Sequence, residues 1–310
     1  MSRFSASEIH ATVLCRETVE FFRANEPAVV VDATLGLGGH TEAILEAIDG
    51  VRVIGIDQDD EAIALASERL QRFADRIEIV RSNFASIKSV LAERGIKGVD
   101  GIVADLGVSS LQFDSPERGF SFRFDAPLDM RMNAADGDPT AADLLRDLSE
   151  EEIADIIYRY GEERNSRRIA RRIVWKRSIG EPILTTAELA ETVEKAAGGR
   201  GKDKIHPATR TFQALRIAVN RELEVLENFL TDAIDVLAPG GTIAVITFHS
   251  LEDRIVKQAF SKAAGKCICP PRLPQCQCGA EKKLEILTRK PISPEQAEID
   301  SNPRARCRKT

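Results

Sequence analysis

The feature that most constrains the fold is a regular alternation of apolar, strand-like runs with helix-like segments. Four runs, at residues 27–34, 51–57, 77–84 and 98–105, are separated by helical periodicity that begins near residue 41, near residue 59 and over 86–94. Such a β-α-β series predicts an α/β fold, with a mostly parallel sheet covered by helices on both faces.

The alternation is interrupted by a charged, helical stretch over residues 134–205. It then resumes with a long helix over 219–237, the turn Pro239-Gly240-Gly241, and a strand over 242–248. A helix over 251–264 and a last strand over 282–289 complete the pattern. A chain of 310 residues is long enough for one large domain and a smaller one. We therefore predict a core formed by 1–133 and 213–310, and an inserted helical, substrate-recognition domain over 134–212.

Charge and hydropathy exclude several classes of protein. The formal net charge of −6 argues against indiscriminate binding to nucleic acid, although a local basic patch remains compatible with it. No apolar segment approaches the roughly 18 residues that a membrane span requires. No basic-then-apolar leader opens the sequence, so a cytoplasmic location without membrane contact is the default expectation.

Four of the six cysteines cluster near the C-terminus: Cys267, Cys269, Cys276 and Cys278. They could hold a structural zinc ion, although the Cys-x-Cys spacing is tighter than the usual Cys-x-x-Cys. The alternative is a set of reduced thiols in a proline-rich loop, and we assign no metal from the sequence. The cysteine content does not suggest a disulfide scaffold and fits a reducing compartment.

A glycine-rich turn, DATLGLGGHT, follows the first strand and lets the backbone approach a ligand at a helix N-terminus. The second strand ends in Asp57, where a carboxylate can accept hydrogen bonds from both ribose hydroxyls of a nucleoside. Together they predict a nucleoside cofactor. A dinucleotide fingerprint would require a third glycine, where this chain has Thr41. The structural alternatives are a helix cap for Asp57 and a capping or packing role for His40.

The spacing of Asp32, Gly36 and Gly38 resembles the Asp-Pro-Phe-x-Gly-x-Gly turn of enzymes that methylate amino groups of DNA bases. The turn Pro239-Gly240-Gly241 is placed like a turn common in methyltransferases, though any tight turn could use it. These two features favour S-adenosyl-L-methionine over a dinucleotide.

Residues 105–132 form a long polar and aromatic stretch without sustained helix or strand period, which predicts a loop at the carboxyl edge of the sheet. Four of the thirteen phenylalanines lie in it: Phe113, Phe120, Phe122 and Phe124. Large apolar rings in a solvated connection need a partner on which to stack.

One family resemblance is carried by this loop together with PLDMRM, DATLGLGGH, YGEER, HPATRTFQALRIAVNRE and ITFHSLEDRIVK. These segments closely resemble the bacterial 16S ribosomal RNA cytosine-N4 methyltransferases, the methyltransferase H or MraW-like family. The resemblance runs from about residue 10 to the end. The sequence departs from the family at the C-terminus, where NPRARCRKT carries Cys307. Only part of the family has the cysteine cluster, which argues against a catalytic role for the cluster.

The resemblance implies a Rossmann-like class I methyltransferase that acts on the N4 amino group of a cytidine, position 1402 of 16S rRNA in the small ribosomal subunit. It also implies a set of contacts with S-adenosyl-L-methionine. These come from Gly38, Gly39, His40, Asp57, Phe84, Asp105 and Gln112.

The residues agree with this reaction on physical grounds. A cytosine amine is conjugated with its ring and is a poor nucleophile, so an acceptor that localises its lone pair would promote attack. Asp105 lies at the strand end where this acceptor is expected. DLGVSS lacks the prolines and the ring of the usual Asp-Pro-Pro-Tyr motif. The base-stacking ring is therefore sought among Phe120, Phe122 and Phe124, whose alternative role is to close the loop as a hydrophobic cluster.

RNA contacts are expected from the insertion and from the helix that leaves it. Seven cations crowd two or three helical turns: Arg164, Arg167, Arg168, Arg171, Arg172, Lys176 and Arg177. The exit helix adds the polar candidates Thr209, Arg210, Gln213, Arg216 and Asn220, and its apolar face carries Phe212, Leu215, Val219 and Leu223. The cations could instead form a solvated face paired with Glu162 and Glu163.

Three alternatives stay open on the sequence. A small-molecule methyltransferase would not need the arginine-rich helices, and a nicotinamide dehydrogenase would bind a different cofactor. A non-catalytic RNA-binding assembly factor would bind subunits and transfer no methyl group. The oligomeric state is also open, a homodimer being one option.

Overall fold

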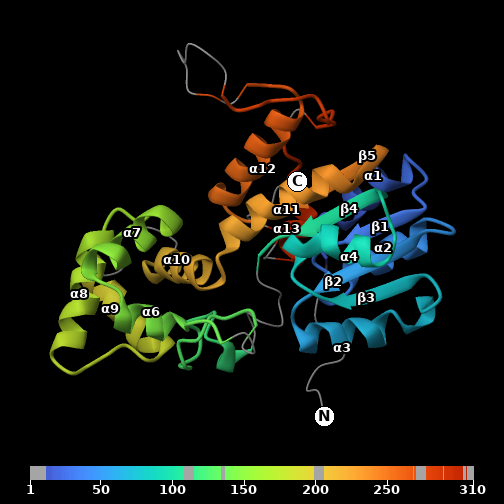
Figure 1. The fold of residues 1–310 in the computed structure, drawn as a ribbon. Helices are drawn as coiled ribbons and strands as arrows, with labels where there is room; N and C mark the ends of the chain where they lie inside the picture. The colour runs from blue at the N-terminus through green and yellow to red at the C-terminus, as the bar shows by residue number, and fades with distance from the viewer. Residues whose placement is uncertain are drawn as a thin grey trace. The chain divides into compact units, whose positions relative to one another are not determined.

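The computed structural model describes residues 12–107, 115–133, 137–198, 206–267, 269, 277–288, 290–302 and 305. The chain divides into two compact units (Figure 1). One unit, here called the core unit, comprises residues 1–107 and 223–310, and the other, the helical unit, comprises residues 108–222.

The core unit contains a parallel five-stranded sheet in the order β3-β2-β1-β4-β5. The strands are β1 (Val29–Asp32), β2 (Arg52–Asp57), β3 (Ile77–Arg81), β4 (Val99–Asp105) and β5 (Leu237–Ile246). The predicted Rossmann-like α/β architecture is confirmed, and each of the first four strands lies within its predicted run.

Helices cover both faces of this sheet, because apolar residues alternate between the faces along each buried strand. Val30, Val53 and Val103 pack on one side with α1 (Cys15–Arg23), α2 (Gly39–Ala47) and α3 (Asp60–Arg69). Val31 and Ile102 pack on the other side with α4 (Ile87–Glu93), α11 (Glu222–Val236) and α12 (Ser250–Ala263). A short helix, α13 (Gln296–Ser301), lies near the end of the chain.

In the second half of the core unit one prediction is confirmed and one is wrong. The helix predicted over 219–237 is confirmed as α11, although residues 219 and 220 belong to α10 (Ala208–Asn220), which ends where Arg221 adopts a left-handed backbone conformation (φ 50°). The predicted strand 282–289 is absent from its described residues, 282–288, of which only Lys282 forms a bridge, to Ala264. Residues 283–288 instead line a groove of about 1320 Å³ together with α1 and β5. They do not extend the sheet.

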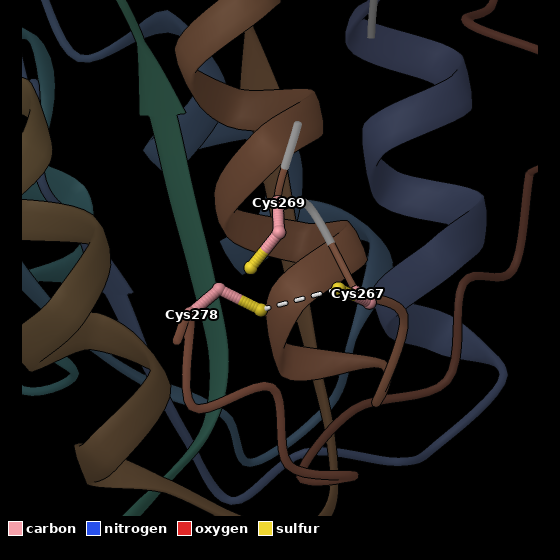
Figure 2. A group of neighbouring side chains, drawn as sticks. All are labelled: Cys267, Cys269 and Cys278. Carbon is pink, nitrogen blue, oxygen red and sulfur yellow. Dashed lines mark hydrogen bonds between the residues drawn. The ribbon is translucent and has the colours of Figure 1, made fainter. Parts of the chain in front are cut away.

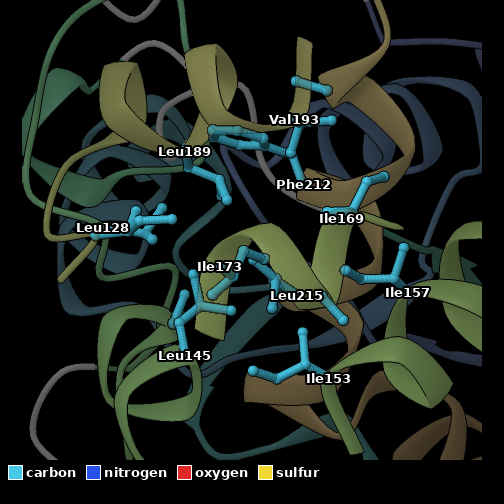
Figure 3. Packing of buried hydrophobic residues seen from close by; sticks show 14 of the residues in the cluster. Leu128, Leu145, Ile153, Ile157, Ile169, Ile173, Leu189, Val193, Phe212 and Leu215 are labelled. Carbon is cyan, nitrogen blue, oxygen red and sulfur yellow. The ribbon is translucent and has the colours of Figure 1, made fainter. Parts of the chain in front are cut away.

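The helical unit consists of five helices within its described residues: α6 (Ala141–Asp147), α7 (Glu150–Gly161), α8 (Ser166–Ser178), α9 (Thr186–Ala197) and α10 (Ala208–Asn220). Ser149 and Thr185 form capping boxes that start α7 and α9. Leu145, Ile157, Ile169, Leu189 and Leu215 lie in one hydrophobic cluster that joins the five helices (Figure 3). The helical character predicted for 134–205 is therefore confirmed where it is described.

The helical unit is larger than the predicted insertion of 134–212. It begins at residue 108 because Phe120, Leu128 and Met130, from the loop after β4, are buried in its hydrophobic cluster. It ends at residue 222 because α10 contributes Phe212 and Leu215 to the same cluster. The described part of the predicted loop has no long element, only a short 3-10 helix, η3 (Pro116–Arg118), and a bridge from Pro127 to Thr185. None of the described helices is both long and apolar enough to cross a membrane.

Candidate functional site

Three carboxylates lie at the carboxyl edge of the sheet, at the ends of neighbouring strands. Asp32 ends β1, Asp57 ends β2 and Asp105 ends β4. Since β1 lies between β2 and β4, the strand order reverses here, and open α/β sheets bind ligands at such a position. This edge is the candidate cofactor site.

Asp32 anchors the glycine-rich turn from inside the protein. Its carboxylate is buried and accepts hydrogen bonds from the backbone N–H of Thr34 at 3.3 Å and from Oγ1 of Thr41 at 2.7 Å. Burial raises the pKa of Asp32 to about 6, although the hydrogen bond from Thr41 opposes the shift. Asp32 thus fixes both ends of the turn and does not face a ligand.

This buried acid predicts a pH-dependent stability. Its folded-state pKa lies above the ordinary value of 3.8, so the folded protein binds the proton more tightly. The resulting stability is present below pH 4 and is lost as the pH rises through about 6, by up to about 3 kcal/mol. Asp32→Asn, which keeps an acceptor for Thr34, should flatten this dependence in urea titrations between pH 4 and 7. An unchanged slope would contradict the assignment.

The turn itself requires glycine at two positions. Gly36 and Gly38 have φ of +51° and +78°, and Gly38 immediately precedes α2. A Cβ at Gly38 would lie 2.8 Å from Leu70, and one at Gly39 would lie 1.8 Å from Oγ1 of Thr12. A Cβ at Gly38 or Gly39 would therefore collide with a neighbouring side chain, whereas one at Gly36 would meet only the carbonyl oxygen of Thr34, at 3.8 Å.

Asp57 supports the same turn from the neighbouring strand. Oδ2 accepts a hydrogen bond from the N–H of Gly36 at 2.8 Å, and Oδ1 accepts one from the N–H of Asp59 at 2.9 Å. Burial raises its pKa above the ordinary range for an aspartate. Each carboxylate oxygen has a second lone pair, so both can also accept a hydrogen bond from a ligand hydroxyl. The helix cap ahead of α3 is Asp59, whose side chain accepts from the N–H of Glu61, and not Asp57.

Asp105 and His40 meet at the end of β4. The backbone N–H of Asp105 donates to Oγ1 of Thr34 at 2.6 Å, which ties β4 to the turn after β1. The Asp105 side chain is 22% exposed and its Oδ2 lies 3.8 Å from Nε2 of the buried His40. A partly exposed carboxylate whose backbone is fixed in this way is suited to accept a hydrogen bond from a substrate amine.

Phe84 follows β3 in a short 3-10 helix, η2 (Phe84–Ser86), whose N-cap is Asn83. Its ring meets Phe229 edge-on with centroids 5.1 Å apart, and it packs against the hydrophobic cluster of the core unit. Asn83 also donates from Nδ2 to Oε1 of Gln58 at 3.0 Å. This places Phe84 near the carboxyl edge, one strand beyond Asp57, as a half-buried apolar wall.

A polar cluster after β5 was not predicted as functional. Glu252 is 3% exposed, and its carboxylate accepts from the N–H of Phe248 at 2.8 Å and lies 3.2 Å from Nε2 of His249. His249 caps α12 in a capping box with Glu252. Since β5 neighbours β4, this turn is part of the same edge. The sequence contained one usable signal, a His followed three residues later by Glu at a helix start.

The three phenylalanines proposed for base stacking have different environments in the helical unit. Phe120 is 6% exposed and is part of the hydrophobic cluster. Phe122 packs on Phe212 and His206, with centroid distances of 5.0 and 4.8 Å. Only Phe124 is well exposed, at 52%. The alternative role, a hydrophobic cluster that closes the loop, therefore describes Phe120 and Phe122.

The polar candidates on α10 are mostly bound to the protein itself. Asn220 donates from Nδ2 to the carbonyl of Met130 at 2.8 Å and accepts from the N–H of Met132 at 2.7 Å. Gln213 donates to the carbonyl of Tyr160. Arg216 pairs with both carboxylate oxygens of Glu222 at 2.9 and 3.0 Å. These three side chains hold the loop and helices together.

Arg210 remains on the surface, 54% exposed and 3.7 Å from the Glu163 carboxylate. The cations in and just before α8 differ in their partners. Arg177 donates from Nη1 to the carbonyls of Leu145, Arg146 and Leu148 and so caps α6. Arg164, Arg167 and Arg168 are exposed, and no acidic group among the described residues lies within 4.0 Å of them. Gln112 and Cys276 lie outside the described residues.

A family model and curated relatives agree on one family. The model of the MraW methylase family matches residues 7–310. A protein of Trichlorobacter lovleyi named "Ribosomal RNA small subunit methyltransferase H" is 51% identical over 303 residues, 97% of this chain and 96% of its own length. A protein of Carboxydothermus hydrogenoformans with the same name is 48% identical over 300 residues, again 97% and 96%. A crystal structure described as a putative rRNA-methylase from Clostridium thermocellum aligns with 81% of this chain and 83% of that one, at 14% identity and a TM-score of 0.39.

Proposed function

The chain belongs to the MraW methylase family, and from that premise we propose that it methylates the N4 amino group of a cytidine in 16S rRNA of the small ribosomal subunit. It is a Rossmann-like class I methyltransferase, and its methyl donor is S-adenosyl-L-methionine. The observation that carries the proposal is the arrangement of Asp57, the glycine turn and Asp105 along one edge of the sheet. The target, by the same proposal, is cytidine 1402.

The residues at this edge fit the donor by their chemistry. The Asp57 carboxylate has lone pairs for both ribose hydroxyls, and the first turn of α2 presents the backbone N–H groups of Gly39 and His40 toward an anionic group. Phe84 supplies an apolar surface next to Asp57. Bound there, S-adenosyl-L-methionine supplies an electrophilic methyl group on a positively charged sulfur.

The protein's part in the reaction is to hold the amine. The Asp105 carboxylate accepts a hydrogen bond from the cytosine N4–H, which localises the nitrogen lone pair for attack. The amine passes this proton to the Asp105 carboxylate only as the new N–C bond forms and the sulfur–methyl bond breaks, so a strong base is not required beforehand. His40, 3.8 Å from Asp105, restricts the position of that carboxylate. Of the three rings proposed for base stacking, Phe124 has the exposed surface that stacking on a base requires.

The test of this function uses small ribosomal subunits from cells that lack the enzyme. The purified protein is incubated with these subunits and radiolabelled S-adenosyl-L-methionine, and the label is mapped by nuclease digestion and mass spectrometry. Label on one cytosine amino group supports the proposal. Binding of subunits without any label would favour a non-catalytic assembly factor, and labelled small molecules alone would favour the small-molecule alternative.

The exposed face of α8 is the proposed contact with rRNA phosphates. It carries Arg167 and Arg168, with Arg164 just before the helix, and one turn further Arg171, 3.6 Å from Glu150. Trp175, 46% exposed, lies on the same helix with the guanidinium of Arg172 4.5 Å from its ring centre. Arginines bind phosphate oxygens bidentately, and an exposed indole can stack on an unpaired base.

Arg164→Ala, Arg167→Ala and Arg168→Ala, combined in one variant, should weaken binding to small subunits by about 10–100-fold at moderate salt. The slope of log Kd against log salt concentration should fall by up to about three, because each phosphate contact contributes about one. Filter binding over a range of potassium chloride concentrations measures both quantities.

A matched control removes three exposed cations, Arg23, Arg52 and Lys97, near the amino edge of the sheet. It changes the net charge equally and should leave the salt slope unchanged. Equal slopes for the two triple variants would show that only net charge matters and would reject α8 as the contact.

A further inference from the structure

We propose that Cys267, Cys269 and Cys278 bind one structural zinc ion. The three thiols belong to the core unit and converge from two directions along the chain (Figure 2). Cys267 and Cys269 follow the C-terminal end of α12, and Cys278 lies on the segment that returns toward it. This site is separate from the carboxyl-edge residues assigned to methyl transfer and does not depend on that function.

The sulfur positions match a metal site and not a disulfide. The Sγ atoms of Cys267 and Cys278 are 3.9 Å apart, and all three Sγ atoms lie within 4.8 Å of one another. Zinc–sulfur bonds of about 2.3 Å at tetrahedral angles place ligand sulfurs about 3.8 Å apart. A disulfide would require about 2.05 Å. The thiols are therefore close to ligand positions before any rearrangement.

A backbone hydrogen bond marks one sulfur as an acceptor. The N–H of Gln277 donates to Sγ of Cys269 at 3.3 Å, across eight residues of the chain. Donors of this kind stabilise the negative charge of a ligating thiolate and fix its direction. The same bond connects the two arms of the loop, because Gln277 is next to Cys278.

The loop that carries the thiols has a fixed base, and its described residues form no hydrophobic core. Ala264 forms an antiparallel bridge with Lys282, and the N–H groups of Lys283 and Leu284 donate to the carbonyl of Ala263 at 2.6 and 2.9 Å. None of the described residues between 264 and 288 is buried. A long connection without apolar burial is ordered only by other interactions, and a metal ion that joins its two arms supplies them.

The chemistry selects zinc among common divalent ions. Soft thiolates prefer zinc to magnesium or calcium, and zinc has no redox chemistry of its own at such a site. Binding converts three thiols into three thiolates and releases three protons to solvent, which leaves one negative charge on the site before a fourth ligand is counted. A structural site takes a fourth ligand besides these three thiols.

The test measures metal content directly in the full-length protein. The protein is stripped with a chelator under reducing conditions, reloaded with zinc sulfate, desalted and analysed by inductively coupled plasma mass spectrometry. About one zinc per chain is expected, falling about tenfold in Cys267→Ser, Cys269→Ser and Cys278→Ser. Cobalt loading should give a thiolate-to-metal absorption band that the same variants lose.

Cys15→Ser is the matched control, because Cys15 is a thiol on α1 outside the cluster. It should retain full zinc. Limited trypsin digestion gives a second readout that does not depend on global folding: cleavage at Lys266 and Lys282 should be about tenfold faster without zinc. Zinc content below one tenth per chain, equal loss in Cys15→Ser, or a stoichiometric disulfide within the cluster of the isolated protein would overturn the proposal.

Discussion

Asp105→Asn is expected to lower the rate constant for methyl transfer by about 100–1,000-fold, the cost of removing one well-placed charged acceptor from a transition state. The substitution preserves the size of the side chain, and the backbone N–H of residue 105 can still donate to Thr34. Cofactor affinity should change only a few-fold. Single-turnover kinetics with small subunits, beside calorimetric titration of S-adenosylhomocysteine, separate the two quantities.

This separation matters because Asp105 was assigned to both the cofactor and the amine. A carboxylate that acts on the amine changes the chemical step, whereas one that only holds the cofactor changes its affinity. A loss of affinity as large as the loss of rate would therefore remove Asp105 from the catalytic role and leave it as a binding residue.

Asp100→Asn is the control on the same strand. Asp100 lies near the other end of β4, where Oδ2 accepts from the N–H groups of Ala28 and Val29 at 2.9 Å each. Its substitution should reduce stability by about 1–2 kcal/mol, through lost charge-assisted hydrogen bonds, without changing the rate per folded molecule. Equal rate losses in the two variants would indicate a general defect of β4.

The parallel sheet could be predicted because its strands are buried on both faces. Val29–Asp32 and Val99–Asp105 are nearly continuous apolar runs that end in a carboxylate, and this local pattern requires no tertiary information. The break between α10 and α11 could not be predicted in the same way. Arg221 ends α10 in a left-handed conformation, and no glycine or proline marks the position.

The convergence of three acids at one edge of the sheet was predictable for a similar reason. Strand order places the ends of β1, β2 and β4 side by side, so acids at three strand ends converge once the topology is known. The division of labour among them was not predictable. Burial makes Asp32 an internal anchor, whereas Asp57 and Asp105 keep capacity for a ligand, and only the hydrogen-bond partners distinguish these roles.

The polar residues of α10 show that a helical pattern does not identify which partner a side chain contacts. Gln213, Arg216 and Asn220 recur on one face of α10, the pattern expected of a surface that binds RNA. In the structure they satisfy carbonyls and a carboxylate of the helical unit itself. Periodicity identifies the face of a helix but not its partner. Of the two predicted RNA-binding surfaces, we therefore keep the exposed arginines at the start of α8 as the proposed one.

Asp57→Ala is expected to weaken binding of S-adenosylhomocysteine by about 10–100-fold, because two hydrogen bonds to a charged acceptor are lost. Asp60→Ala, an exposed acid paired with Arg81 at the start of α3, is the matched control and should retain affinity. Asp57→Ala also removes the hydrogen bond from the N–H of Gly36, which can lower stability. Thermal unfolding of both variants measures this loss of stability separately from the loss of cofactor affinity. If both bind equally well, Asp57 serves the turn alone.

The pH dependence of binding gives an independent check on the same carboxylate. Burial raises the pKa of Asp57, so protonation should begin to weaken cofactor binding at a higher pH than for an exposed aspartate. The protonated acid donates one hydrogen and keeps fewer lone pairs for ribose hydroxyls. Affinity should therefore fall as the pH decreases through that raised pKa, and this fall should be absent in Asp57→Ala.

The identity of the cofactor is tested by competition, because a strand-end acid is common to S-adenosyl-L-methionine sites and dinucleotide sites. A nicotinamide dinucleotide should fail to displace S-adenosylhomocysteine. Displacement would instead support a dinucleotide site.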